Sequence, residues 1–443
     1  MTVAKRHVEV DPAFARAFHE ASRRLGRDAG LGASRRERLD RFLAQGMPTP
    51  RVEAWKYTNV GKTANQPFAL ATKRQIGVED VSPWLAGGPA ARRIIFANGH
   101  LVPEMSHVGG LPEGVTVQGL AKRLQERPDE VRRAIDALID GRGFTDLNAA
   151  FVEDGAWIEV ADGVLCDKPL QLLFVTAGDA PAMAHPRVVV RLGRNSRLHL
   201  IESHVGHRPG PGLTNLVLQI RVAEGGRLDH DRFQTAGEGA TALSKADVEV
   251  AGRGVYDQTV LSLGGALQRN ESEVRITGSN AAAHLNGAFM PTAAEHVDTL
   301  IQMHHMAPDC ESNQFYKGVL SGRSRGVFAG KIIVHQEAQR TNAFQQSNNL
   351  LRSDDAEIDA KPELEIYADD VKCSHGATVG DLDDTALFYL RSRGLPRDLA
   401  EAMLTYAFAG EVVERFKDEA LRATAKRALF RRLPGGEALM GML

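Results

Sequence analysis

The chain has 443 residues, of which 43% are hydrophobic and 25% are charged, a composition typical of folded globular proteins. This length predicts two or three domains rather than a single core. A formal net charge of −2 gives no electrostatic case for binding nucleic acid or an anionic membrane.

Two further features indicate the cellular compartment. Residues 1–20 are charged throughout and lack the apolar segment of a signal peptide, and no run of about 18 apolar residues could span a membrane. The cysteines, Cys166, Cys310 and Cys373, are odd in number and far apart, which is typical of reduced thiols. We therefore expect a cytoplasmic protein. No CxxC pair marks a preformed zinc or four-cysteine cluster site.

The first third of the chain predicts a mainly helical domain, residues 1–155. Apolar spacing predicts helices over residues 11–27, 34–45 (capped by Ser34, ended by Gly46) and 119–140 (interrupted at Pro128), and a strand over residues 92–96 that ends in the turn Asn98-Gly99. Between them, the aromatic segment Arg51–Thr58 indicates a packing corner.

From Trp157 short alternating runs replace the helical spacing. Pairs of such runs share one frame, with the second run starting eight residues after the first: Val190 and Leu198, Ile220 and Leu228, Val248 and Tyr256, Val274 and Ala282, and later Leu350 and Ile358. The frame recurs after 30, 28 and 26 residues, from Val190 to Val274. An irregular period in the twenties with two strands per unit indicates a solenoid. We expect a parallel β-helix over residues 156–380. A two-sheet sandwich, the competing architecture, would need short hairpin turns, whereas here longer connections separate the units.

The most reactive-looking segment is Lys361–Gly380. It alternates as a strand through Leu364 and Ile366, passes an acidic pair, Asp369 and Asp370, and reaches Cys373 and His375. A thiol and an imidazole at i and i+2 of an extended chain point to the same face, so both could meet one metal ion or sulfur species.

Residues 381–443 predict a helical domain. Asp381 or Asp383 can cap a first helix that ends at Gly394, and Pro396 can start a second helix with a continuous apolar face. Because a solenoid requires covered ends, we expect this tail to cover the last rung and to have further surface for a partner.

Lys361–Gly380, continued by Leu387–Gly394, resembles the C-terminal signature of the SufB/SufD family, subunits of the SUF iron–sulfur cluster assembly machinery. The Trp-Lys-Tyr-Thr element at Trp55 is also similar to a family element. The scarcity of cysteine favours the SufD branch. This resemblance implies a right-handed parallel β-helix, mainly β, flanked by N-terminal and C-terminal helical domains.

The resemblance also implies a function. The chain would be a scaffold subunit without catalytic turnover. It would pair through its final rungs, Asn342–Ser374, with a SufB-like subunit, and through its C-terminal helices with a SufC-like ABC-type ATPase. His375, with Cys373 beside it, would contact iron or a transient iron–sulfur cluster at the subunit interface. Reduced flavin as a cofactor and a homodimer of the isolated chain stay open.

Other function classes find less support in the sequence. A β-helix polysaccharide lyase or hydrolase, with Asp369 and Asp370 as acid and base, is the main alternative. A hexapeptide-repeat acyltransferase would need a strict six-residue period. No phosphate-binding loop or catalytic nucleophile motif is present. Met303-His304-His305-Met306 with Cys310 could bind a soft metal, although adjacent strand histidines face opposite ways.

Overall fold

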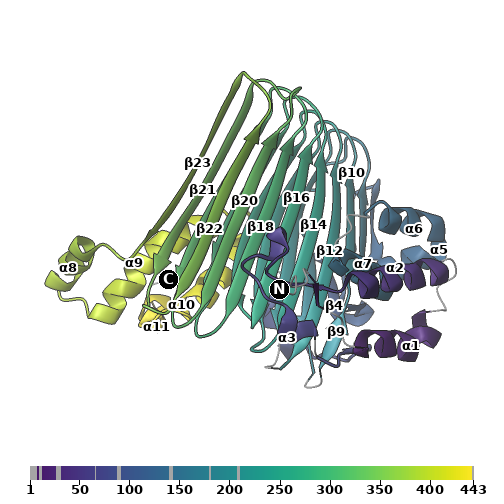
Figure 1. The fold of residues 1–443 in the computed structure, drawn as a ribbon, viewed down its shortest axis with the longest axis horizontal. Coiled ribbons are helices and arrows are strands. Elements are labelled where there is room, and N and C mark those ends of the chain that lie inside the picture. Colours follow the sequence, from purple (N-terminus) through teal and green to yellow (C-terminus); the bar gives the residue numbers. More distant parts are fainter. Residues whose placement is uncertain are drawn as a thin grey trace, which may run out of the picture.

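The structure is a computed structural model that describes residues 7–8, 12–25, 31–64, 66–86, 91–138, 143–178, 181–206 and 210–441. Its centre is a parallel β-solenoid in which successive strands alternate between two facing sheets (Figure 1). The prediction of a mainly β chain with a parallel β-helix and helices at both ends is confirmed. None of the helices in the described ranges combines the length and apolar character needed to cross a bilayer.

The first sheet, called sheet I, runs from β6 near the N-terminal helices to β22 at the opposite end. Its strands are β3 (Ala69–Leu70), β6 (Val115–Gly119), β7 (Gly155–Val160), β9 (Ala182–Ala184), β10 (Arg187–Leu192), β12 (Gly212–Val222), β14 (Thr241–Val250), β16 (Leu267–Ile276), β18 (His296–His305), β20 (Arg325–Val334) and β22 (Glu357–Ile366).

The facing sheet, called sheet II, runs from β5 to β23. Its strands are β4 (Arg92–Ala97), β5 (His100–Leu101), β8 (Leu170–Thr176), β11 (Arg197–Gly206), β13 (Arg227–Ala236), β15 (Val255–Gly264), β17 (Ala282–Phe289), β19 (Glu311–Leu320), β21 (Thr341–Leu351) and β23 (Val371–Gly380). A separate antiparallel pair joins β1 (His7–Val8) to β2 (Met47–Pro48).

The repeat frame read from the sequence corresponds to one corner of the solenoid. The first four pairs, such as Ile220 and Leu228, cross from sheet I to sheet II. The fifth pair, Leu350 and Ile358, crosses back from sheet II to sheet I, so it is half a turn out of phase. Both corners are short, as residues 223–226 and 237–240 illustrate, so loop length does not distinguish a solenoid from a sandwich. The parallel pairing of the strands identifies the solenoid.

The N-terminal region contributes several short helices, most of which gather at one end of the solenoid (Figure 1). They are α1 (Ala13–Leu25), α2 (Gly32–Gln45), α3 (Gly61–Ala64), α4 (Val78–Val81), α5 (Leu120–Glu126), α6 (Pro128–Asp136) and α7 (Gly143–Phe151), with 3₁₀ turns at Glu53–Trp55, Ser82–Trp84 and Pro103–Met105. The break at Pro128 and the stop at Gly46, with φ of 77°, are as predicted. Ser34 is not the cap of α2, which starts two residues earlier.

The aromatic segment around Trp55 packs on the outer face of sheet I. Trp55 is buried, and the Arg269 guanidinium of β16 lies 3.8 Å from the centre of its ring. Glu53 forms an ion pair with Lys361 of β22. This segment is therefore the packing corner that the sequence predicts, and it ties the N-terminal region to the last turns of the solenoid.

The C-terminal helices are α8 (Asp384–Ser392), α9 (Arg397–Val413), α10 (Glu419–Phe430) and α11 (Gly436–Met440). Asp383 caps α8, accepting a hydrogen bond from the Thr385 backbone N–H at 2.7 Å. The apolar face of α9 packs on the outer face of sheet II, over β15, β17 and β19. Lys317 of β19 pairs with Glu411 of α9 at 2.6 Å.

The expectation that this tail covers the last rung is wrong. The strands β22 and β23 are half-buried to exposed along their length. The reason is the wide apolar surface on the outer face of sheet II, which includes Phe233, Leu261 and Phe315 and accommodates α9 and α10 better than the rung end does. Figure 1 shows α8 projecting away from the solenoid beside this uncovered end.

Candidate functional site at the open end of the solenoid

The two ends of the solenoid differ in how their sheets terminate. At the N-terminal end, an antiparallel strand closes each sheet, β6 on β7 and β5 on β4. At the other end, β22 pairs only with β20 and β23 only with β21, within the described residues. The backbone groups on the free sides of these strands have no strand partner, which makes this rung a template for pairing with another chain.

Cys373 and His375 lie on β23, in the middle of this open rung. Cys373 is in register with the fully buried Ala343 and packs partly against the core between the sheets. His375 is two residues further on the same strand and therefore on the same face. The prediction that the two side chains share one face is confirmed, and that face is the inner one. Because no rung covers it, His375 is exposed to solvent.

A buried amide lies one turn below His375. Gln345 of β21 is in register with His375 and is 3% exposed. Its Nε2 donates a hydrogen bond of 2.8 Å to Oε1 of Gln314, the residue in register on β19. Its own Oε1 has no hydrogen-bond partner. A Cβ at Gly330 on the facing sheet would collide with this side chain, so the glycine makes room for Gln345.

The surroundings of Cys373 do not activate its thiol. Burial raises the pKa of Cys373 above its ordinary value, and the backbone N–H of Ala343 only partly opposes this. Lys372 is exposed and alternates to the opposite face of β23, while Asp369 and Asp370 lie exposed in the preceding corner. At neutral pH the thiol therefore stays protonated. Burial also raises the pKa values of Cys166 and Cys310.

The second histidine cluster does not converge on one point. His304 faces outward, with its ring 5.8 Å from that of His335, whereas His305 is buried inside and lies 2.8 Å from Oγ of Ser312. Met303 is buried and Met306 is exposed. No group of three or more His, Cys, Asp or Glu side chains in the described ranges is arranged to hold a metal ion.

Sequence reasoning missed a charged cluster inside the solenoid. Glu202, His204, His230 and Arg232 lie between the sheets on β11 and β13, and Glu202 and His230 are fully buried. Burial alone would raise the pKa of Glu202, but Arg232 and the two histidines outweigh it and hold the pKa well below the ordinary value. Glu202 and Arg232 are 30 residues apart and in register on neighbouring turns, and this one-turn spacing could have revealed the cluster.

Beside the open rung, α8 carries exposed aromatic side chains. Phe388 is 73% exposed and Tyr389 is 55% exposed, and no residue of α8 is buried. The Arg393 guanidinium lies 4.5 Å from the centre of the Tyr389 ring. Exposed aromatic and arginine side chains on a projecting helix are typical of a protein-binding surface.

Comparison with known proteins gives matches along most of the chain. Residues 174–408 match the family model described as "SUF system FeS cluster assembly, SufBD core domain", and residues 12–172 match the SufBD protein N-terminal region. The chain is 32% identical to the iron–sulfur cluster assembly protein SufD of Escherichia coli, over 90% of this chain and 92% of that protein.

Two other relatives cover similar lengths. An iron–sulfur cluster assembly SufBD family protein of Synechocystis is 29% identical over 86% of this chain and 87% of its own. The SufD protein of Bacillus subtilis is 23% identical over 94% of this chain and 96% of its own.

Proposed function

Since the chain belongs to the SufB/SufD family of iron–sulfur cluster assembly proteins, we propose that it is a scaffold subunit on which nascent clusters are built, without turnover of its own. The observation that carries this proposal is the open rung, where an exposed imidazole and a half-buried thiol share one face of an edge strand that pairs on one side only. Iron and sulfide are then the cargo of the site, and the chain supplies ligands and a surface.

A SufB-like subunit is the proposed partner at this rung. A second solenoid could continue both sheets by pairing with the free sides of β22 and β23, in the same way that each earlier turn pairs with the next. At the N-terminal end the terminal strands β5 and β6 are short and antiparallel, so a partner there would not continue the parallel ladder. The free edge of β22 and β23 would also allow two copies of this chain to pair when the partner is absent.

His375 is the proposed iron ligand at this interface. A neutral imidazole binds iron through one nitrogen, and ligating imidazoles usually donate their other N–H to a fixed acceptor. The unpaired Oε1 of Gln345, one turn below, can act as that acceptor. Two side chains on one strand are too few for a complete iron site, so the partner would provide the other ligands. Cys373, with its raised pKa, has the smaller role.

A SufC-like ATPase is the proposed partner of α8. This helix buries none of its residues on the solenoid, and it presents Phe388 and Tyr389 next to the open rung. The larger helices α9 and α10 instead hold the tail on sheet II, through contacts such as the pair between Arg432 and Glu295 at 2.7 Å. Nucleotide-driven motion would then reach the open rung through α8. We place this assembly in the cytoplasm.

The proposal is tested by producing the chain together with SufB-like and SufC-like proteins and purifying the complex without oxygen. A complex that contains all three chains, iron and sulfide, with the visible absorption of an iron–sulfur cluster, supports it. A chain that binds neither partner, or a complex in which iron and sulfide are absent after reconstitution, contradicts it.

A further inference from the structure

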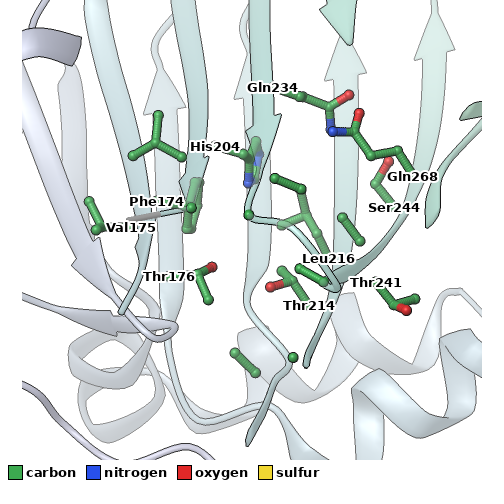
Figure 2. Close-up of a pocket in the computed structure, with 18 of the residues that line it drawn as sticks. Phe174, Val175, Thr176, His204, Thr214, Leu216, Gln234, Thr241, Ser244 and Gln268 are labelled. Atoms are coloured by element: carbon green, nitrogen blue, oxygen red, sulfur yellow. The ribbon is translucent and has the colours of Figure 1, made fainter. Parts of the chain in front are cut away.

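A cavity lies between the two sheets, at the corner where strands of sheet II end and strands of sheet I begin. It is far from the open rung, since β11, which lines it, is five turns away from β21. Residues of β8, β11 and β13 line it on one side and residues of β12, β14 and β16 on the other. Figure 2 shows Phe174, His204 and Gln234, which come from sheet II, and Ser244 and Gln268, which come from sheet I.

The cavity is large enough for a small molecule. It offers about 50 Å³ to the centres of water molecules, and about 10–15 Å³ of such space accommodates one water. Apolar walls are formed by the inward-facing side chains of Phe174 and Leu216. The Phe174 ring stacks on the His204 ring with centres 4.8 Å apart, giving a flat wall.

One lining side chain, Arg232, has a buried N–H group that is free to bind a ligand. Among the described lining residues, Arg232 is the only one with a permanent charge. It is 4% exposed, and its Nε lies 2.9 Å from Oε1 of Glu202. Its Nη2 is buried without a hydrogen-bond partner. A buried guanidinium N–H favours an oxygen acceptor, and a carboxylate is the acceptor that it binds most strongly.

The hydrogen bonds around Glu202 fix the protons of both histidines. Glu202 is ionised, so the Nε2 atoms of His204 and His230, 2.5 Å and 3.1 Å from its oxygens, both carry the proton. Nδ1 of His230 then accepts from the hydroxyl of Tyr256 at 3.1 Å. Nδ1 of His204 is consequently the nitrogen that can take up a further proton.

We propose that this cavity binds a small monocarboxylic acid with a compact apolar body, its carboxylate against Arg232 and its body against Phe174 and Leu216. The site lies within this chain alone and does not depend on the proposed assembly function. The free donor for the carboxylate is Nη2 of Arg232. The Ser244 hydroxyl already donates to Oδ1 of Asn270 at 2.9 Å and Nε2 of Gln268 to the Leu263 carbonyl at 2.8 Å, so these two side chains line the cavity without adding a donor.

Binding should be coupled to uptake of one proton. The negative charge of Glu202 and the positive charge of Arg232 already cancel, so a bound carboxylate would leave one buried negative charge uncompensated. Protonation of His204 at Nδ1 restores the balance. Burial lowers the pKa of free His204, with Arg232 and His230 acting in the same direction and Glu202 opposing them, so the proton is absent before binding. The carboxylate raises that pKa, and affinity should increase as pH falls.

The proposal is tested with isobutyrate as the ligand and with isobutyramide, which has the same shape but no charge, as the control. Calorimetry on the isolated full-length chain should detect saturable isobutyrate binding at least tenfold tighter than isobutyramide binding. The affinity should increase up to tenfold per pH unit between pH 8 and pH 6, for one linked proton. Buffers with different ionisation heats should report uptake of about one proton. Absence of saturable binding, equal binding of the amide, or a pH-independent affinity would overturn the proposal.

Variants of single residues distinguish a loss of binding in the cavity from a loss of folding. Arg232→Gln should remove the preference for the acid, and Arg221→Gln, which breaks a 2.6 Å pair with buried Asp247 outside the cavity, should leave binding unchanged. If Arg232→Gln does not fold, Ala242→Leu decides, because it fills the cavity without touching the charged cluster. Unchanged isobutyrate binding in folded Ala242→Leu would place the ligand elsewhere and refute the site.

Discussion

His375 on the uncovered strand β23 is in register with Gln345, whose amide is buried one turn below and fixed by a hydrogen bond to Gln314. The neighbour of the exposed imidazole on the next turn is therefore a buried, hydrogen-bonded amide. Since Oε1 of Gln345 has no partner, it can accept the N–H of one ring nitrogen and leave the other free to bind iron.

We expect Gln345→Leu to weaken cluster formation without unfolding the chain. Loss of an outer acceptor typically costs about 10–100-fold in metal affinity. Nitrogen NMR of labelled His375 should show a changed ratio of its two neutral tautomers. The matched control is Gln346→Leu, the next residue on the same strand, which is exposed on the outer face. Identical tautomer ratios in the wild type and in Gln345→Leu would exclude the positioning role.

Lysines on the inner face of the last rung should block the SufB-like partner. Ala377 and Val379 are exposed in the free chain, so Ala377→Lys/Val379→Lys should fold normally. In the complex the added charges would be buried without partners, at a cost of about 3–5 kcal/mol, so binding should weaken by on the order of 100-fold or more.

The control for this surface is Asp354→Lys/Asp355→Lys, in an exposed corner between β21 and β22. It adds the same number of lysines away from the inner face of the rung. Surface plasmon resonance with the immobilised partner measures both variants. Equal affinity of the two double variants would show that the partner does not stack on the open rung.

Substitutions in α8 should weaken ATPase binding selectively. Phe388→Ser/Tyr389→Ser removes exposed aromatic side chains, each worth about 2 kcal/mol if it is an interface hot spot, so affinity should fall at least about 30-fold with an unchanged melting temperature. Truncation at Gly380 is unsuitable, because it would also uncover the apolar face of sheet II. The control is Val78→Ser, which is 66% exposed. Full ATPase binding by the α8 variant would refute this docking site.

Acid should destabilise the chain before its carboxylates titrate. Burial lowers the pKa of His185 to about 3 and that of His305 to about 4. Both are neutral in the folded state, whereas unfolded histidine protonates near pH 6.5, so stability is lost as pH falls below about 6.5. Each contributes up to about 1.4 kcal/mol per pH unit until its folded pKa is reached.

Urea unfolding between pH 7 and pH 4.5 measures this loss. His305→Asn should flatten the dependence, although its stability at pH 7 falls because the contact with Ser312 changes. His19→Gln, on the exposed face of α1, should leave the pH dependence as it is. A wild-type stability that stays constant down to pH 5 would contradict the buried neutral state of these histidines.

The sequence was sufficient to predict the solenoid, because each turn repeats the same local alternation and corner chemistry. It could not predict the open rung. Whether α9 covers β23 or the face of sheet II depends on the apolar area that Phe233 and Phe315 expose there, and these residues are far from α9 in sequence. The sequence also did not show that the pair Leu350 and Ile358 crosses the solenoid at the other corner. Both corners consist of similar short turns, so the local sequence does not distinguish them.

The candidate site was predictable only in part. The period of a strand places Cys373 and His375 on one face, and the structure confirms it. The sequence did not predict that Gln345 is the neighbour of His375, because this pairing depends on the register of two strands 30 residues apart. Predicting the cluster of Glu202 and Arg232 would have required the same alignment of inward-facing residues on neighbouring turns.

The most direct test of the assembly function is the iron and sulfide content of the purified complex that carries His375→Ala. His375 is exposed and holds no core contact, so the variant should assemble with both partners and melt at nearly the wild-type temperature. Its iron and sulfide should fall sharply, and Cys373→Ser should lose less. A His375→Ala complex with the full wild-type content of iron and sulfide would contradict the account, and His375 would then be only the last residue of an inner row.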